Sequence, residues 1–195
     1  MTPARGGRRP GDSGTREAIL AAARASFAAD GFRGTTIRGV ARAAAVDPAL
    51  VHHFFGTKDG LFAAAMELPF DPSALLPTVL GDTLDGAGER IARTFLTVWD
   101  ATPEQAPMLN LLRSALEHQA AADMLREFLT SVVLRALAER MTGPDAELRA
   151  SLVAAHVIGI AVARYSLRLE PVAGADVDTL ARLVGPALER YLSPG

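Results

Sequence analysis

The chain has 195 residues, 49% of them hydrophobic, and its 20 Lys and Arg against 22 Asp and Glu give a formal net charge of −2. No apolar run reaches the length of about 18 residues that a membrane span needs, and no apolar segment follows the basic N-terminus, so we expect a cytoplasmic protein without signal peptide or membrane contact. The absence of cysteine excludes disulfide scaffolds, zinc–thiolate sites and cysteine nucleophiles.

The basic residues are concentrated in the N-terminal third. Residues 1–66 contain nine basic and five acidic side chains, a formal charge of +4, whereas residues 67–195 contain eleven and seventeen, a formal charge of −6. This asymmetry favours a polyanion partner for the N-terminal third alone, although an ordinary solvated surface can show the same split. Residues 1–14, rich in Gly, Arg and Pro, are expected to form a flexible basic arm, which reaches a minor groove or only keeps the chain soluble.

Capping residues and hydrophobic spacing divide the rest of the chain into helices. Thr15, Thr36 and Asp47 each stand where a side-chain oxygen can accept the free N–H groups of a first helical turn, and Gly31 and Gly56 stand where helices end. No segment alternates with period two between hairpin turns. The sequence therefore predicts an all-α fold of about nine helices, over residues 16–30, 37–43, 48–55, 58–68, 73–80, 88–101, 107–140 with a break near 120–122, 145–169 and 176–192.

The stretch TIRGVARAAAVDPALVHHFF, residues 36–55, combines two short helices with a tight turn. This is the plan of a helix-turn-helix, whose second helix is short because only its first turns enter a major groove. A helical hairpin inside a larger bundle is the alternative that the spacing leaves open. In either case the pair is expected to be held together by Val40, Ala41, Val51, Phe54 and Phe55.

Residues 15–68 resemble the DNA-binding domain of the tetracycline-repressor (TetR) family of bacterial transcription regulators. The matching pieces are FAADGFRGTTIRGVA, AAAVDPALVHHFFGTKDGLF and the spacing between them, which together are far more specific than a bare helix-turn-helix. The later helices match the family's all-α ligand-binding and dimerisation domain in number and length, without a comparable motif. The resemblance thus implies a DNA-binding domain over residues 15–57 and a ligand-binding and dimerisation domain over 58–195.

The function implied by this resemblance is that of a homodimeric, ligand-responsive regulator. It would be a repressor that a small apolar or aromatic effector releases from a palindromic operator on double-stranded DNA, with no cofactor and no enzyme activity. An activator, or a regulator with a vestigial pocket, fits the sequence equally well. An all-α enzyme is the rival class, but the sequence contains no HExxH, no paired Glu-x-x-His and no phosphate-binding glycine loop.

In the family, the start of the second helix and the exposed face of the third contact DNA. Arg38 can donate a fork of hydrogen bonds to guanine O6 and N7, or is an ordinary solvated arginine. His52 and His53 are expected near phosphates; they are poor metal ligands, because adjacent helical residues point about 100° apart and no third ligand is near. The DNA-contact residues that the resemblance implies are Thr36, Arg38, Asp47, Pro48, Ala49, Leu50, His52, His53 and Lys58.

Three positions depart from the family pattern. Ala45 occupies a turn position that usually holds glycine, and it costs about 1 kcal/mol if φ is positive there. Gly39 replaces a common acidic residue and weakens its helix by roughly 0.5–1 kcal/mol. His52 replaces a tyrosine. The fold is expected to survive these changes, but the base preference cannot be deduced from the family.

Two C-terminal helices are expected to form the dimer interface. The stretch SLVAAHVIGIAVARYSL, beginning at Ser151, is apolar on almost every side, so a helix there must be covered all round. A partner chain covers it in a four-helix interface, as in the family, or the chain's own core buries it in a monomer. The predicted interface residues are Ala154, Ala155, Ile158, Val162, Leu183, Leu188 and Tyr191.

A ligand pocket is expected among the helices between residues 88 and 165. Aromatic and methionine side chains at helical spacing supply candidate walls, although the same residues can be ordinary core. A ligand would favour a subunit arrangement in which the recognition helices no longer lie about 34–36 Å apart, with the helix over 58–68 as the lever. The predicted lining residues are Phe95, Trp99, Met108, Leu112, Arg113, Met124 and Phe128.

Overall fold

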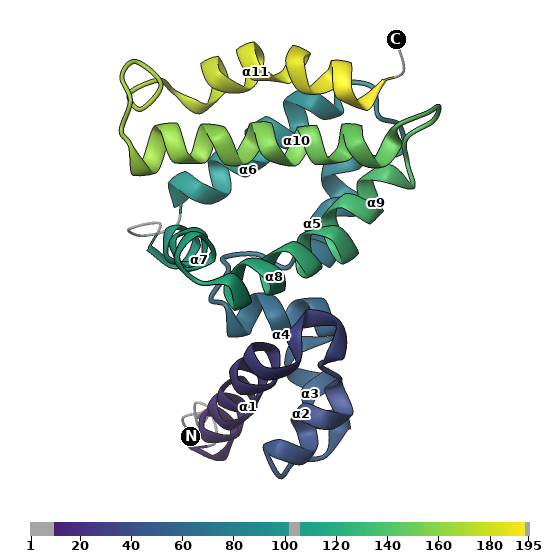
Figure 1. Cartoon of the computed structure of the whole chain (residues 1–195), viewed down its shortest axis with the longest axis vertical. Helices are drawn as coiled ribbons and strands as arrows, with labels where there is room; N and C mark the ends of the chain where they lie inside the picture. Colours follow the sequence, from purple (N-terminus) through teal and green to yellow (C-terminus); the bar gives the residue numbers. More distant parts are fainter. Residues whose placement is uncertain (1–9, 102–105, 194–195) are drawn as a thin grey trace, which may run out of the picture.

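The computed structural model describes residues 10–101 and 106–193, and helices make up most of them, with no strand in these ranges. The all-α prediction is therefore confirmed. Figure 1 shows α1 to α4 gathered at one end of an elongated molecule and α10 and α11 crossing the opposite end. The α-helices are α1 (Pro10–Gly34), α2 (Ile37–Ala43), α3 (Pro48–Phe55), α4 (Lys58–Ala65), α5 (Pro72–Leu80), α6 (Ala87–Ala101), α7 (Ala106–Glu117), α8 (Gln119–Phe128), α9 (Arg135–Ala138), α10 (Ala146–Ala161) and α11 (Val177–Leu192).

Two π-helical turns, η1 (Leu129–Leu134) and η2 (Val162–Ser166), interrupt the α-helical pattern without breaking the helices. Because α8, η1 and α9 follow one another directly, as do α10 and η2, the described segments form ten continuous helices. The expected break near residues 120–122 lies slightly earlier, at His118, which has extended backbone angles between α7 and α8.

The first helix begins earlier than the sequence predicts. It starts at Pro10 instead of near residue 16, because proline is tolerated in a first helical turn, where its missing N–H leaves no hydrogen bond unmade. The part of the predicted basic arm that remains, residues 1–9, lies outside the described residues. At its other end the helix is broken at Gly31, whose φ of 70° and ψ of −179° are not helical.

The N-terminal core is built around four phenylalanine rings. Phe62 stacks on Phe128 with ring centroids 4.2 Å apart, and it meets Phe27 and Phe32 edge-on at 5.0 and 5.3 Å. Phe62 belongs to α4 and Phe128 to α8, so the core that holds α1, α2 and α3 also includes parts of the chain well beyond residue 57. The helix-turn-helix is therefore anchored directly on the C-terminal half of the protein.

The C-terminal core joins α6, α9, α10 and α11. The closest approach in this core is at Gly88 of α6 and Gly185 of α11. A Cβ atom at Gly88 would lie 2.3 Å from the Gly185 carbonyl oxygen, and one at Gly185 would lie 2.9 Å from the Cα of Glu89. Glycine at both positions allows the two helix backbones to pack in direct contact. Glu189 of α11 strengthens the pair by accepting hydrogen bonds from the N–H groups of Gly86 and Gly88.

Candidate nucleic-acid interface

The turn between α2 and α3 is a Schellman motif with alanine in place of the usual glycine. The N–H of Val46 donates to the Ala41 carbonyl at 2.9 Å, and the N–H of Ala45 donates to the Arg42 carbonyl at 3.2 Å. These two bonds satisfy carbonyl groups that the end of α2 would otherwise leave free. The motif requires a left-handed backbone conformation at the residue that follows the C-cap. Ala45 supplies it with φ of 54°. The sequence left open whether φ is positive at Ala45, and in the structure it is positive.

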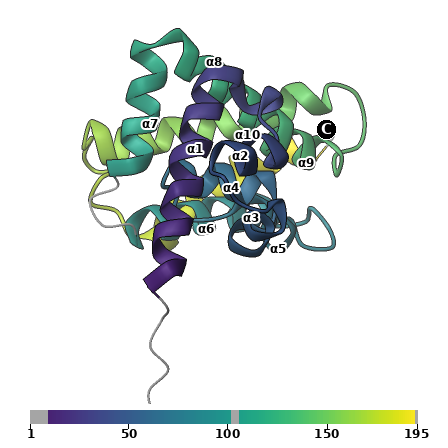
Figure 2. The ribbon, with the colours of Figure 1, turned by 90° about the horizontal axis from the view of Figure 1, so that it is seen from below.

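Asp47 and Pro48 set the start of α3. The Asp47 carboxylate accepts a hydrogen bond from the Ala49 N–H at 2.7 Å, and Pro48 occupies the first turn. Val51 and Phe55 are buried against the N-terminal core, while Asp47, Ala49, His52 and His53 are exposed. Pro48 and Leu50 are half-buried at the edge of this exposed face. Figure 2, which views the molecule from this end, shows α1, α2 and α3 in front of the C-terminal helices.

Helix α2 and its N-cap contribute an exposed hydroxyl and two exposed cations. Thr36 is the N-cap, and its Oγ1 accepts the Gly39 N–H at 3.0 Å. Arg38 and Arg42 are both exposed on α2, and within the described residues neither forms an ion pair. Their guanidinium groups are thus free to bind an external anion or a base edge. Arg42 was not among the residues that the sequence singled out; its exposure beside Arg38 is a feature of the folded helix.

The two histidines differ in their local contacts. His52 Nδ1 lies 2.8 Å from the carbonyl oxygen of Gly56, which can only accept, so Nδ1 carries a proton and donates it. The neutral ring then presents Nε2 as an acceptor, and a donor at Nε2 requires the protonated ring. His53 packs edge-on against Phe54, with ring centroids 5.5 Å apart. Across the described residues no group of three or more His, Asp and Glu side chains could hold a metal ion.

The Lys58 ammonium makes its contacts inside the protein. Its Nζ donates to the Thr35 carbonyl at 3.0 Å and to the Arg33 carbonyl at 3.4 Å, and it lies 4.5 Å from the centre of the Phe32 ring. Burial lowers the pKa of Lys58 from its ordinary value, and the nearby carboxylates of Asp59 and Glu127 act in the opposite direction. The structure thus gives this lysine a role in joining α4 to the end of α1, and the phosphate contact stays a prediction.

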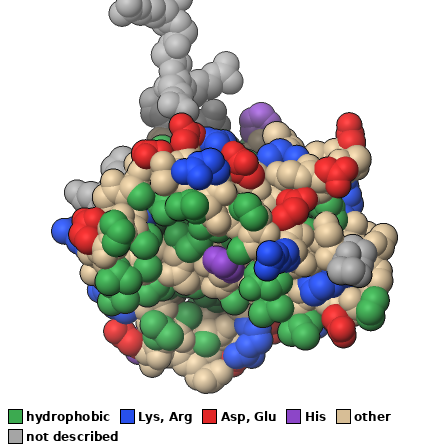
Figure 3. All heavy atoms as spheres, turned by 90° about the horizontal axis from the view of Figure 1, so that it is seen from above, with side chains coloured by type: hydrophobic (Ala, Val, Ile, Leu, Met, Phe, Trp, Pro, Cys, Tyr) green, Lys and Arg blue, Asp and Glu red, His purple; other side chains and the backbone are tan. Residues whose placement is uncertain are grey.

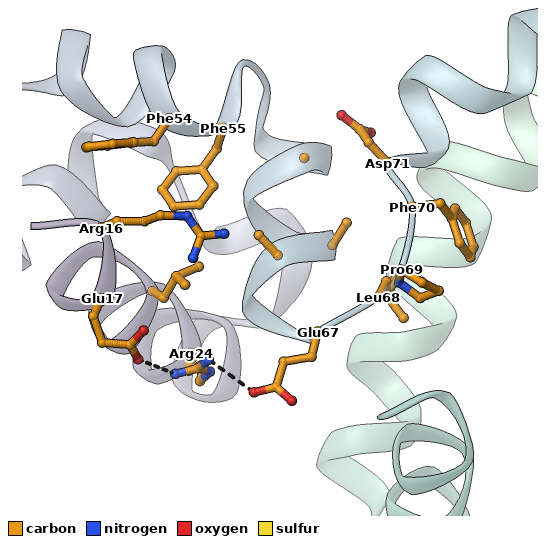
Figure 4. Close-up of a pocket in the computed structure, with 14 residues that line it drawn as sticks. Arg16, Glu17, Arg24, Phe54, Phe55, Glu67, Leu68, Pro69, Phe70 and Asp71 are labelled. Carbon is orange, nitrogen blue, oxygen red and sulfur yellow. Dashed lines mark hydrogen bonds and ion pairs between the residues drawn. The ribbon is translucent and has the colours of Figure 1, made fainter. Parts of the chain in front are cut away.

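An open groove of about 590 Å³ separates the helix-turn-helix part from residues 68–71 (Figure 4). Arg24 crosses one side of it. Its Nε donates to the Ala65 carbonyl at 3.0 Å, and its two terminal nitrogens pair with Glu17 at 3.3 Å and Glu67 at 3.4 Å. Arg24 therefore bridges two carboxylates and a main-chain carbonyl across this groove, and we interpret the groove as an internal contact between α1 and the end of α4.

A second cavity, of about 190 Å³, lies in the C-terminal half and has almost entirely apolar walls. It is lined by α5, α6, η1, α9 and α10, together with Phe70. Of the residues that the sequence predicted to line a pocket, the structure brings Phe95 and Trp99 to this cavity. The apolar residues contributed by α5 and α10 were missed, because helical spacing shows that a side chain is buried and does not show against what.

The other predicted lining residues lie elsewhere. Phe128 and Met124 pack in the N-terminal core, because the face of α8 that carries them contacts α1 and α4, so these two predictions are wrong. Leu112 packs against the cluster of Trp99 and Ala161 and is not part of the cavity lining, and Arg113 is exposed on α7. The side chain of Met108 lies outside the described residues. No part of α4 lines the cavity.

The predicted dimer residues fall into two groups. Leu183 is 62% exposed, Ala155 is also exposed, and Ala154, Ile158, Val162 and Tyr191 are half-buried. Leu188 is 0% exposed in the C-terminal core, because its face of α11 packs against α6, so it cannot contact a partner and that prediction is wrong. Figure 3, seen from above, shows hydrophobic side chains gathered on the end of the molecule that α10 and α11 form.

Two family models match the chain. The model described as the tetracyclin repressor-like C-terminal domain matches residues 85–192, and the model for bacterial regulatory proteins of the tetR family matches residues 19–65. The first match covers more than half of the chain, and the second covers the segment that contains the helix-turn-helix.

Three individual proteins illustrate the similarity. A TetR-family regulator from Streptomyces coelicolor A3, of known structure, is 43% identical, with a TM-score of 0.53, and the match covers 96% of this chain and 99% of that one. GusR of Salmonella enterica is 20% identical with a TM-score of 0.50 over 95% of this chain and 97% of its own, and shows the fold alone. The HTH-type transcriptional regulator BetI of Burkholderia cenocepacia is 26% identical over an alignment of 131 positions, which covers 58% of this chain and 67% of BetI.

Proposed function

Because this chain belongs to the tetracycline-repressor family of bacterial transcription regulators, we propose that it is a cytoplasmic, homodimeric repressor released from a palindromic operator by a small apolar effector. DNA binding and transcription regulation follow from the family. The dimer, the direction of regulation and the effector are the proposal. The observation that best supports this proposal is that the exposed face of α3 and the exposed apolar face of α10 and α11 lie at opposite ends of the same molecule.

We propose that α3 enters the major groove with Ala49 and His52 toward the bases. The half-buried Pro48 and Leu50 border that contact, and Asp47 holds the first turn of α3 in its capped conformation. Arg38 supports base recognition, because its guanidinium has no ion-pair partner in the described residues and a guanine edge offers two acceptors to it. Thr36 and His53 are proposed to contact phosphates on either side.

The dimer proposal rests on apolar surface that the chain does not cover itself. Leu148, Leu152 and Leu183 are 60%, 40% and 62% exposed, on α10 and α11. The run Ala146–Ser166 is long and apolar enough to cross a membrane by length and composition. Its most apolar 18-residue stretch has a mean hydropathy of 1.5, yet only 22% of that stretch is buried in the single chain. A helix of this kind needs a cover, and a second copy supplies the same surface by two-fold symmetry.

Arg149 and Arg164 favour a protein partner over a lipid one. Arg149 donates to the Tyr191 carbonyl at 3.2 Å, and Arg164 pairs with Asp100 at 3.0 Å while donating to three carbonyls near the start of α11. Both guanidinium groups sit on the apolar run and are committed to polar groups of the protein. A bilayer core would not tolerate this polar network, whereas a partner helix packed beside it would.

We assign the coupling between cavity and DNA to α8 and η1, in place of the residues 58–68 expected from the sequence. Leu129 and Val133 of η1 line the apolar cavity, while the neighbouring Phe128 and Val132 are buried in the core that holds the helix-turn-helix. A ligand that moves η1 therefore moves the side chain stacked on Phe62. A π-helical turn is a frequent site of such adjustments, because its hydrogen bonds can shift register at small cost.

The sequence placed the domain boundary at residue 57, before α4. We propose that the DNA-binding unit includes α4, because Leu61, Phe62 and Ala65 are buried in its core. The ligand-binding and dimerisation unit then begins with α5. The α8–η1 helix belongs to both.

The experiment is a fluorescence-anisotropy titration of duplex DNA, with the oligomeric state measured in parallel by sedimentation. The proposal predicts a dimer that binds one palindromic site, and an effector that weakens binding without dissociating the dimer. A monomer at micromolar concentration, or DNA affinity unchanged at saturating effector, would contradict it. An activator role is tested separately, by transcription from an operator-bearing promoter with and without the protein.

A further inference from the structure

The helix formed by α8 and η1 has a third face, besides the one that lines the cavity and the one that enters the N-terminal core. Glu127 and Ser131 share this face, and both contact Arg33. The Glu127 Oε2 accepts the main-chain N–H of Arg33 at 3.0 Å, and the Arg33 Nε donates to the Ser131 Oγ at 3.4 Å. Arg33 belongs to the α1–α2 corner, residues 31–35, which follows the break in α1. The third face therefore joins the C-terminal half to the segment that precedes α2.

The α1–α2 corner is shaped around the Glu127 carboxylate. A Cβ atom at Gly31 would lie 2.9 Å from the Glu127 Oε2, so a side chain there would displace the carboxylate. Thr35 is 2% exposed and closes the corner from inside, because its Oγ1 donates to the Gly31 carbonyl at 2.8 Å. Lys58 donates to the carbonyls of Arg33 and Thr35. Arg33 is thus held by α8 through its N–H and by α4 through its carbonyl.

The α1–α2 corner sets the start of α2. Only Gly34 and Thr35 separate Arg33 from Thr36, the N-cap of α2, and Arg38 follows two residues later. The tight hydrogen bonds within the corner leave little slack between these positions. A displacement of Arg33 is therefore passed on to the proposed phosphate contact and to the proposed base contact.

The face that contacts the α1–α2 corner is opposite to the face that lines the cavity. Successive residues of an α-helix are rotated by about 100°, so Glu127 and the cavity-lining Leu129 point about 200° apart. Anything that enlarges the cavity from the side of Leu129 presses the helix toward the corner. A rotation of the helix about its axis would break both contacts to Arg33. Figure 1 shows α8 where the N-terminal helices meet the rest of the molecule.

We propose that Glu127 is a positioning residue for DNA binding: its hydrogen bond to Arg33 fixes the α1–α2 corner and makes the placement of α2 depend on the state of the cavity. The dependence on the cavity rests on the function proposed above. Phe128, the next residue, stacks on Phe62 and so holds α4. Two neighbouring residues of one helix thus attach two different elements of the DNA-binding unit.

The first measurement is the hydrogen exchange of the Arg33 amide, followed by NMR in the full chain without DNA. Glu127→Ala and Glu127→Gln remove the same charge at the same place, but only glutamine keeps an oxygen that can accept the N–H. We expect Glu127→Ala to accelerate this exchange about tenfold and Glu127→Gln less than about threefold, because only the first loses the hydrogen bond. Asp123→Ala is the control, since this carboxylate of α8 pairs with Gln119 and Arg126 of the same helix.

The second measurement is the affinity of these variants for the duplex that the wild-type chain selects from a random library, by fluorescence anisotropy. We expect Glu127→Ala to bind about tenfold more weakly than Glu127→Gln, because the loosened corner must be ordered at the moment of binding. Asp123→Ala should bind at least as tightly as the wild type, since it removes a negative charge without loosening the corner.

The third measurement is a double-mutant cycle between the cavity and Glu127. Ala150→Leu fills the cavity from α10, and Val157→Leu replaces it if the larger change prevents folding. We expect the cavity-filling substitution to change DNA affinity by about threefold or more in the wild type, and by less than half as much on a logarithmic scale in Glu127→Ala. The melting midpoint reports whether each variant is folded.

The proposal is overturned by any of three results. The first is that Glu127→Gln behaves like Glu127→Ala in exchange or in DNA affinity. The second is that Asp123→Ala has the same effects as Glu127→Ala. The third is that cavity filling acts equally, or not at all, in the two backgrounds. Each of these leaves DNA binding itself intact. A wild-type chain that selects no DNA would instead contradict the proposed function, and the exchange measurement would still test the contact to Arg33.

Discussion

At Ala45 the chain turns from α2 into α3 with a φ angle of 54°, in a position where two main-chain hydrogen bonds fix the conformation. A Cβ atom makes this region unfavourable, so Ala45→Gly is expected to stabilise the protein by up to about 1 kcal/mol, once the greater freedom of glycine in the unfolded chain is subtracted. Urea unfolding measures the change. The matched control is Ala43→Gly at the last residue of α2, which should destabilise by up to roughly 0.5–1 kcal/mol; equal effects of the two substitutions would show that the turn is not strained.

Arg38 is the residue whose removal should change DNA specificity. Arg38→Ala is expected to weaken operator binding by about 1–3 kcal/mol and to relax the preference at one base pair, because a bidentate contact to guanine carries both affinity and discrimination. Anisotropy titrations on the operator and on single-base variants test this. Arg113→Ala, an exposed arginine on α7, should leave binding unchanged. An Arg38 variant that loses affinity equally on all sequences would instead assign this residue to a phosphate.

At the scale of elements, the α6–α11 pair depends on two glycines. Gly88→Ala would bring a Cβ within 2.3 Å of the Gly185 carbonyl oxygen and 2.7 Å of the Glu189 nitrogen, atoms of a rigid helix that cannot move aside. We expect a loss of about 1–3 kcal/mol or more in the free energy of unfolding. Gly14→Ala is the control, because nothing lies within 4 Å of its Cβ, and it should gain a few tenths of a kcal/mol or more. A neutral Gly88→Ala would mean that the two helices are farther apart than described.

The helices themselves were largely predictable, because their ends carry local signals. Thr36, Asp47 and Gly31 act at the positions where capping preferences put them. The assignment of Met124 and Phe128 was not predictable, since an apolar stripe on α8 reveals burial and not which of two cores it enters. The π-helical turn η1 has no local sequence signal, and the apolar cavity depends on side chains from helices far apart in sequence.

For the whole molecule, the exposed apolar face of α10 and α11 predicts a dimer. Leu183→Asp introduces a charge at a side chain that is 62% exposed in the single chain. A two-fold dimer contains this substitution once in each protomer, and each lost leucine contact is worth about 1.5 kcal/mol or more. The dimerisation constant should therefore weaken by at least about a hundredfold. Sedimentation measures it. Leu116→Asp is the control, at an 89% exposed leucine outside this face, and should leave the assembly unchanged; loss of the dimer in both variants would point to general destabilisation.

The most direct test of the account is the selection of DNA from a random duplex library by the full chain, followed by titration of the selected site with the wild type and with Ala49→Glu. We expect a palindrome whose half-site centres lie about 34–36 Å apart, or a multiple of one DNA turn. We also expect a large loss of binding for Ala49→Glu, which adds an acidic group to the exposed face of α3. Selection of no common sequence, or a site bound equally by both proteins, would contradict it.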